Sequence, residues 1–157
     1  MRSLTRAALS LLFVLLAIPA VAQSVPNLTG TWVLDVSRSD FGMMPAPAGR
    51  TDVIDHKEPA LVIKRTTTTP NGEVASTLTY AVDGKPYVNK AGNNDISSVL
   101  KWEATTLVVV STAQTPNGEA TITDRFSLSG DGKTLTQQRA ISIQGQELAQ
   151  TMVLAKQ

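Results

Sequence analysis

The segment LVIKRTTTTPNGEVASTLTYAV, residues 61–82, decides the fold class. Its two arms are rich in Val, Ile, Thr and Tyr, which favour extended strands. Between the arms stands Pro70-Asn71-Gly72. Asn-Gly supplies the positive φ angles of a tight hairpin turn, and the proline presets the entry to that turn. The segment therefore predicts a β-hairpin with strands at 61–69 and 73–82.

This hairpin recurs further along the chain. The pentapeptide TPNGE occupies residues 69–73 and again residues 115–119, a shift of 46 positions. The match extends backward, where LVI at 61–63 corresponds to LVV at 107–109. Self-similarity at a fixed period is the signature of a repeated structural unit. We therefore predict an internal repeat of four strands.

Turn residues and apolar alternation predict ten strands in all. Their ranges are 30–36, 51–56, 61–69, 73–82, 86–90, 97–103, 106–114, 119–129, 133–143 and 147–155. After residue 22 the chain has no convincing helical apolar period. Strands joined by short hairpins favour an all-β fold, an antiparallel up-and-down β-barrel of about 8–10 strands, because closure removes exposed sheet edges. A β-sandwich is the alternative, since its sequence pattern is almost the same.

Residues 1–22 have the pattern of a secretory signal peptide. Arg2 and Arg6 precede the apolar run Ala7–Ile18, and the small residues Ala20 and Ala22 form a cleavage signal. The run is shorter than the roughly 20 residues that cross a bilayer. We expect cleavage after Ala22, which leaves 23–157 as a single domain, secreted or periplasmic, with no integral membrane span.

Composition excludes several classes of function. The chain has 157 residues, no cysteine, one histidine and a formal net charge of +1, which becomes −1 without the leader. No disulfide or common zinc site can form, and the charge gives little attraction to nucleic acid. We expect a monomer with no metal and no cofactor.

Alternation along each strand assigns side chains to the interior or to the surface. It places apolar side chains such as Ile54 and Val74 inside, together with polar side chains such as Asp124. So many inward polar groups indicate either a hydrated cavity or a wrong face in some strands. The candidate ligand-binding residues are Arg65, Arg139, Tyr87, His56, Gln137 and Trp102.

The motif Gly30-Thr31-Trp32 at the start of the first strand, followed by a chain of hairpins and an inward Arg139, resembles the lipocalin and fatty-acid-binding-protein (calycin) superfamily. The chain is also similar to small exported lipocalin-like proteins of bacteria. In that superfamily the tryptophan plugs the base of the barrel and a late-strand arginine packs across it. The resemblance implies these structural roles for Trp32 and Arg139.

Three functions are consistent with the sequence. The first is an exported, non-catalytic binding protein for a small apolar or amphiphilic ligand, with Arg65 or Arg139 neutralising a carboxylate. The alternative is a secreted protein- or polysaccharide-interaction module with a fully packed core. The third is a small barrel enzyme using His56. Asp55 cannot easily orient His56, because adjacent strand residues face opposite ways.

Overall fold

The computed structural model describes residues 24–157 apart from 93 and 117, so the predicted leader lies outside the described residues. All ten predicted strands are present. They are β1 (Gly30–Asp40), β2 (Gly49–Lys57), β3 (Ala60–Thr69), β4 (Gly72–Ala81), β5 (Pro86–Ala91), β6 (Asn94–Glu103), β7 (Thr106–Thr115), β8 (Gly118–Leu128), β9 (Thr134–Ile143) and β10 (Gln146–Lys156).

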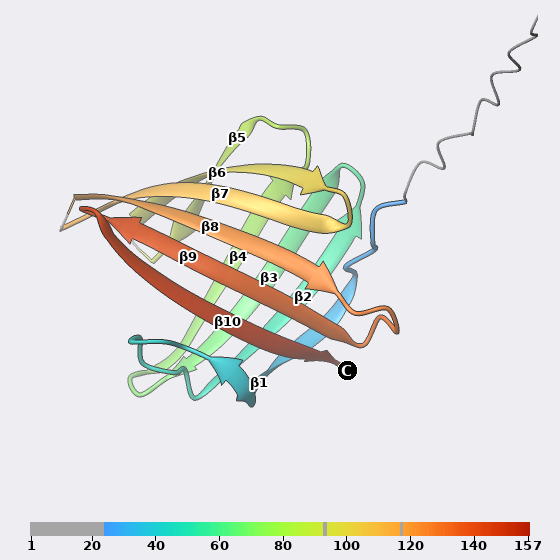
Figure 1. The fold of residues 1–157 in the computed structure, drawn as a ribbon, viewed down its shortest axis with the longest axis horizontal. Helices are drawn as coiled ribbons and strands as arrows, with labels where there is room; N and C mark the ends of the chain where they lie inside the picture. The colour runs from blue at the N-terminus through green and yellow to red at the C-terminus, as the bar shows by residue number, and fades with distance from the viewer. Residues whose placement is uncertain (1–23, 93, 117) are drawn as a thin grey trace, which may run out of the picture.

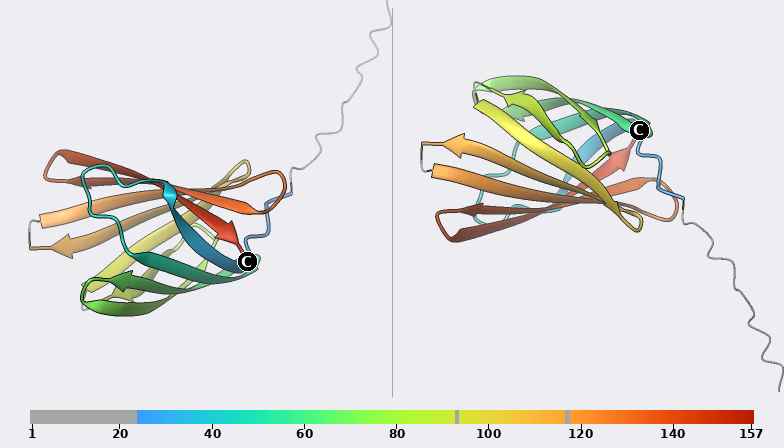
Figure 2. Two further views of the ribbon diagram at one scale, coloured as in Figure 1. Left: turned by 90° about the horizontal axis from the view of Figure 1, so that it is seen from below. Right: turned by 90° about the horizontal axis from the view of Figure 1, so that it is seen from above.

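The strands form one antiparallel sheet that curls into a barrel (Figures 1 and 2). Their order is β4-β3-β2-β1-β10-β9-β8-β7-β6-β5, so chain neighbours are sheet neighbours except at β4 and β5. The first and last strands pair with each other. This up-and-down topology confirms the predicted barrel, and the sandwich alternative is wrong.

The sequence repeat is a repeat of structure. Strand β7 lies 46 residues after β3 at both of its ends. The four strands β2–β5 correspond in order to β6–β9. Along the chain β1 precedes the two copies and β10 follows them, and in the sheet these two strands pair with each other between β2 and β9. The predicted four-strand unit is therefore present twice in one wall.

The barrel has one junction that no backbone ladder seals, between β4 and β5. The Asn89 side chain bridges it. Its Oδ1 accepts from the backbone N–H of Thr79 at 2.7 Å, and its Nδ2 donates to the carbonyl of the same residue at 3.1 Å. A side-chain amide thus takes the place of a paired strand residue at this point.

One end of the barrel is plugged by Trp32, which is fully buried. Its indole Nε1 donates to the carbonyl of Leu28 at 2.9 Å, which fastens the segment before β1 beneath the barrel. The ammonium of Lys156 lies 5.2 Å from the centre of the indole ring, a cation–π contact. The expectation that Arg139 packs across this tryptophan is wrong, because Arg139 pairs with Asp124.

The apolar core follows the predicted alternation. Fourteen buried side chains form one cluster, including Leu61, Leu107 and Leu135. Val74 was expected inside but is 52% exposed, because it lies two residues beyond the β3–β4 turn at the open end. Apolar packing is therefore concentrated toward the plugged end.

Candidate functional site

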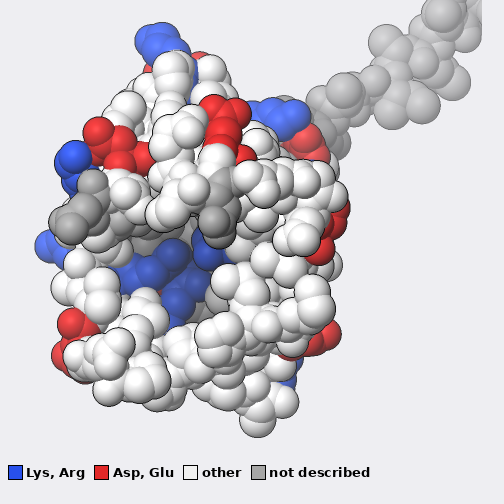
Figure 3. Space-filling view, turned by 90° about the vertical axis from the view of Figure 1, so that its left-hand side faces the viewer, with Lys and Arg blue, Asp and Glu red and all other residues white. Residues whose placement is uncertain are grey.

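The end of the barrel opposite Trp32 is open. The turns β3–β4 and β9–β10 lie around it, with the end of β7 and the start of β8 (Figure 1). The surface view shows a hollow there with basic side chains at its floor (Figure 3). The hollow leads to a cavity of about 230 Å³. Its apolar lining consists of Ile63, Leu78, Ile96, Val109, Ile122 and Phe126.

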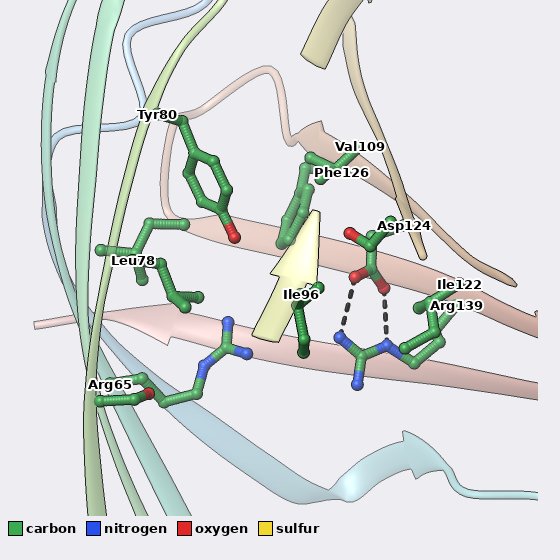
Figure 4. Close-up of a pocket in the computed structure, with 12 residues that line it drawn as sticks. Arg65, Leu78, Tyr80, Ile96, Val109, Ile122, Asp124, Phe126 and Arg139 are labelled. Atoms are coloured by element: carbon green, nitrogen blue, oxygen red, sulfur yellow. Dashed lines mark hydrogen bonds and ion pairs between the residues drawn. The ribbon is translucent and has the colours of Figure 1, made fainter. Parts of the chain in front are cut away.

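Arg65 brings positive charge to the cavity from β3. It lies directly opposite Asp52 of β2 in the sheet register. Its Nε and Nη2 donate to the two oxygens of that carboxylate at 2.8 and 2.9 Å. The remaining nitrogen, Nη1, has no hydrogen-bond partner among the described residues. The Arg65 guanidinium points into the cavity (Figure 4).

A second arginine shares the same carboxylate. Arg50 Nε and Nη2 donate to Asp52 at 3.0 and 2.5 Å, and its Nη1 faces the Met152 sulfur at 3.3 Å. Burial alone would raise the pKa of Asp52, but hydrogen bonds and charges from both arginines hold it well below the usual value. Asp52 is therefore a carboxylate anion that binds two guanidinium groups.

The other ion pair of the cavity is a simple one. Arg139 of β9 donates to both oxygens of Asp124 of β8 at 2.7 and 2.8 Å (Figure 4). Gln137 adds a third hydrogen bond to Asp124 at 2.7 Å. Burial would raise the pKa of Asp124, but these donors and the Arg139 charge lower it. This pair carries one positive and one negative charge.

Neutral polar groups complete the lining. Tyr80 is 8% exposed and its hydroxyl points into the cavity (Figure 4). Burial raises the pKa of this phenol, so it remains protonated at neutral pH. The hydroxyls of Ser98 and Ser111 are hydrogen bonded to each other at 2.8 Å. The cavity thus offers hydroxyl groups beside its two arginines.

His56 belongs to a different cluster, at the plugged end. Its Nδ1 accepts from the backbone N–H of Leu28 at 3.2 Å, and its Nε2 lies 2.8 Å from Oε1 of Glu58. The same carboxylate oxygen accepts from Trp102 Nε1 at 2.6 Å. Both imidazole nitrogens are therefore engaged in holding this end of the barrel together.

The structure divides the six predicted ligand-binding residues between two places. Arg65 and Arg139 line the cavity. Gln137 is buried behind them as a partner of Asp124. The other three lie toward the plugged end, where His56 packs on Trp102 with ring centres 5.9 Å apart and the Tyr87 hydroxyl donates to Asp83. His56 and Trp102 are equivalent positions of the repeat.

Arg50, with Asp52 as its partner, was missed as a site residue. The alternation that puts Ile54 and His56 inside also puts Asp52 and Arg50 inside. The predicted strand began at residue 51, which left Arg50 in the preceding loop. The alternation reaches Arg50 when the strand is extended by one residue, from 51 to 50.

The two buried carboxylates predict a loss of stability in acid. Their pKa values are lower in the folded protein than the ordinary value of about 4, so their stabilisation is complete above about pH 5 and is lost as the pH falls below about 4. We expect the free energy of unfolding, measured with urea, to be level from pH 7 to 5 and to fall between pH 4 and 2.

A matched pair of variants tests whether the loss of stability in acid comes from the buried carboxylates. Asp124→Asn should reduce the loss of stability below pH 4 to the part that Asp52 contributes. Asp55→Asn should leave the loss unchanged, because the Asp55 side chain is 61% exposed. Stability that stays level down to pH 2 in the unaltered protein would contradict the assignment.

No protein-family model and no curated protein sequence matches the chain. Solved structures do match it. Zebrafish ileal bile acid-binding protein, complexed with cholic acid, aligns with a TM-score of 0.58 at 14% identity, over 83% of this chain and 98% of that one. The fatty-acid-binding protein of Manduca sexta aligns with a TM-score of 0.52 at 14% identity, over 82% and 99%. Both of these proteins are calycin- or lipocalin-like barrels.

The fold is that of the calycin barrels. Secretory abundant heat soluble protein 4 of Ramazzottius varieornatus also matches, with a TM-score of 0.61 at 14% identity, over 87% of this chain and 99% of that one. The resemblance that Gly30-Thr31-Trp32 indicated is therefore confirmed at the level of fold. In this calycin-type barrel the site is built from the chain's own ion pairs.

Two further observations concern the described part of the chain. It contains no helix that is long and apolar enough to cross a membrane. Within residues 24–92, 94–116 and 118–157, no cluster of three or more His, Asp or Glu side chains is arranged to hold a metal ion.

Proposed function

We propose that this protein is an exported binding protein that holds one small amphiphilic molecule in the barrel cavity, with an acidic group of the ligand against Arg65 or Arg139. The observation that carries this proposal is that apolar and basic side chains line the same cavity. Six apolar side chains surround space that two guanidinium groups also reach. Apolar burial supplies affinity, and a few placed polar groups fix the orientation of a ligand.

The open cavity favours this function over an interaction module with a fully packed core. The structural neighbours support it as well, since one is a bile acid-binding protein in complex with cholic acid and another is a fatty-acid-binding protein. A ligand with an apolar body and one acidic group fits both observations. Export follows from the predicted leader, residues 1–22.

Mass spectrometry of the protein purified from its own cells tests the proposal. The denatured chain should have the mass of residues 23–157, as cleavage after Ala22 predicts. Under native conditions we expect a monomer that carries a small-molecule adduct, because the cavity retains its ligand. The mass difference between native and denatured protein identifies the class of ligand.

Two outcomes would contradict parts of this proposal separately. A denatured mass that includes residues 1–22 would contradict export. A bare native mass, together with failure of the purified protein to bind decanoate or decan-1-ol, would contradict amphiphile binding. Arg65→Met is the matched variant for the test of amphiphile binding, because it removes a cavity-lining charge while keeping a side chain of similar length.

A further inference from the structure

Charge is divided unequally between the two clusters of ion pairs in the barrel interior. Asp52 accepts four hydrogen bonds, two from Arg50 and two from Arg65, at 2.5–3.0 Å. Asp124 pairs with Arg139 alone among the described arginines. The first cluster therefore has a net charge of +1 and the second has none.

The surplus charge is exposed to the cavity at one side chain. The Arg50 side chain is 5% exposed and that of Asp52 is 1% exposed, whereas the Arg65 side chain is 16% exposed. Arg65 lines the cavity, and Arg50 does not. Since Arg50 occupies part of the carboxylate that would otherwise neutralise Arg65, the guanidinium of Arg65 keeps positive charge for a ligand.

Burial makes this arrangement costly unless an anion is present. Desolvation and the neighbouring charge of Arg65 both lower the pKa of Arg50. Two guanidinium groups on one carboxylate also repel each other, and the low effective dielectric of the interior strengthens that repulsion. One further negative charge at Arg65 would bring the cluster to neutrality, and two would leave an uncompensated buried charge.

We propose that Arg50, a residue outside the cavity lining, makes the cavity select amphiphiles with a single negative charge, because it shares Asp52 and so leaves Arg65 incompletely neutralised. This inference rests on the proposed function and names the ligand class of the same site. Arg50 acts as a positioning residue through Asp52 and Arg65, and Arg139 remains compensated by Asp124.

Decanoate and decan-1-ol are the probes, since they share an apolar chain and differ in charge. Their affinities for the exported protein are measured by calorimetry with four proteins: unaltered, Arg50→Met, Arg50→Lys and the double variant Arg50→Met/Asp52→Asn. In the single Met variant Arg65 has Asp52 to itself, so we expect decanoate affinity to fall on the order of tenfold. Decan-1-ol affinity should stay unchanged.

The other two variants separate charge from shape. Arg50→Lys keeps a positive charge beside Asp52 and should keep the preference for decanoate. The double variant removes one positive and one negative charge, so Arg65 regains its surplus and decanoate affinity should return. Circular dichroism checks that each variant keeps its strands.

The possible failures are distinct. Equal decanoate affinity in the unaltered protein and Arg50→Met would overturn this inference and leave the proposed function standing. A parallel loss of both probes in Arg50→Met would also overturn it, because Arg50 would then act on the shape of the cavity. If the unaltered protein binds neither probe, this inference fails, and a bare native mass would then overturn the proposed function as well.

Discussion

Trp32→Ala will lower the free energy of unfolding by about 3–5 kcal/mol, the range for removing a large aromatic side chain from a packed core. Trp32 is fully buried, and the change leaves a cavity among the side chains at the plugged end. It also removes the hydrogen bond to the Leu28 carbonyl and the surface on which Lys156 lies. Urea denaturation followed by circular dichroism measures the loss.

Trp102→Ala is the matched control for this prediction. Trp102 lies at the same end and has a hydrogen-bonded indole, but its side chain is only partly buried. Its replacement should cost clearly less than that of Trp32. Equal losses for the two variants would mean that the plug has no special part in stability.

Breaking the Asp124–Arg139 pair should have an effect of similar size. Asp124→Leu leaves a largely buried guanidinium without its carboxylate, and Arg139→Met leaves a buried carboxylate with Gln137 as its remaining donor. We expect each change to destabilise the fold by about 3 kcal/mol, the lower part of the range for a broken buried pair.

The double variant Asp124→Leu/Arg139→Met tests whether the loss comes from the unpaired charge. Apolar side chains of similar volume often replace a buried ion pair at little cost. The double variant should therefore be more stable than either single variant, and a double-mutant cycle gives the coupling. The exposed pair Lys57–Asp55, with side chains 82% and 61% exposed, should show little coupling and serves as the control. Additive losses at Asp124 and Arg139 would show that the pair does not act as a unit.

The fold could be predicted from the sequence because its signals are local. A hairpin needs a turn such as Asn71-Gly72 and two alternating strands, and both are visible within about twenty residues. The repeat then showed which strands in one half of the barrel correspond to which strands in the other half. Strand ends were less certain, since β1 continues to Asp40 where the prediction ended at residue 36.

The site could be predicted only in part, because its chemistry depends on pairing across strands. Asp52 lies opposite Arg65 and Asp124 opposite Arg139 in two adjacent-strand registers. Alternation showed that Asp124 and both arginines point inward, but it does not show which charges meet. The sharing of Asp52 by a second arginine requires the three-dimensional structure.

The error at the plugged end has the same origin. The resemblance assigned Arg139 to Trp32 by its position late in the chain. In the structure, β1 and β10 pair with Trp32 directly opposite Lys156, which places a different cation on the indole. Pairing between the first and last strands spans the whole chain, so no local pattern reveals its register.

The Asn89 bridge makes the two copies of the repeat differ in their motions. Strand β8 has a hydrogen-bonded neighbour on each side, whereas its counterpart β4 has a ladder on one side and this amide on the other. Separating β4 from β5 therefore breaks two side-chain hydrogen bonds, while separating β8 from either neighbour breaks a whole ladder. Backbone amides facing the β4–β5 junction will exchange with deuterated water sooner than those of β8, because the barrel will open locally at that junction first.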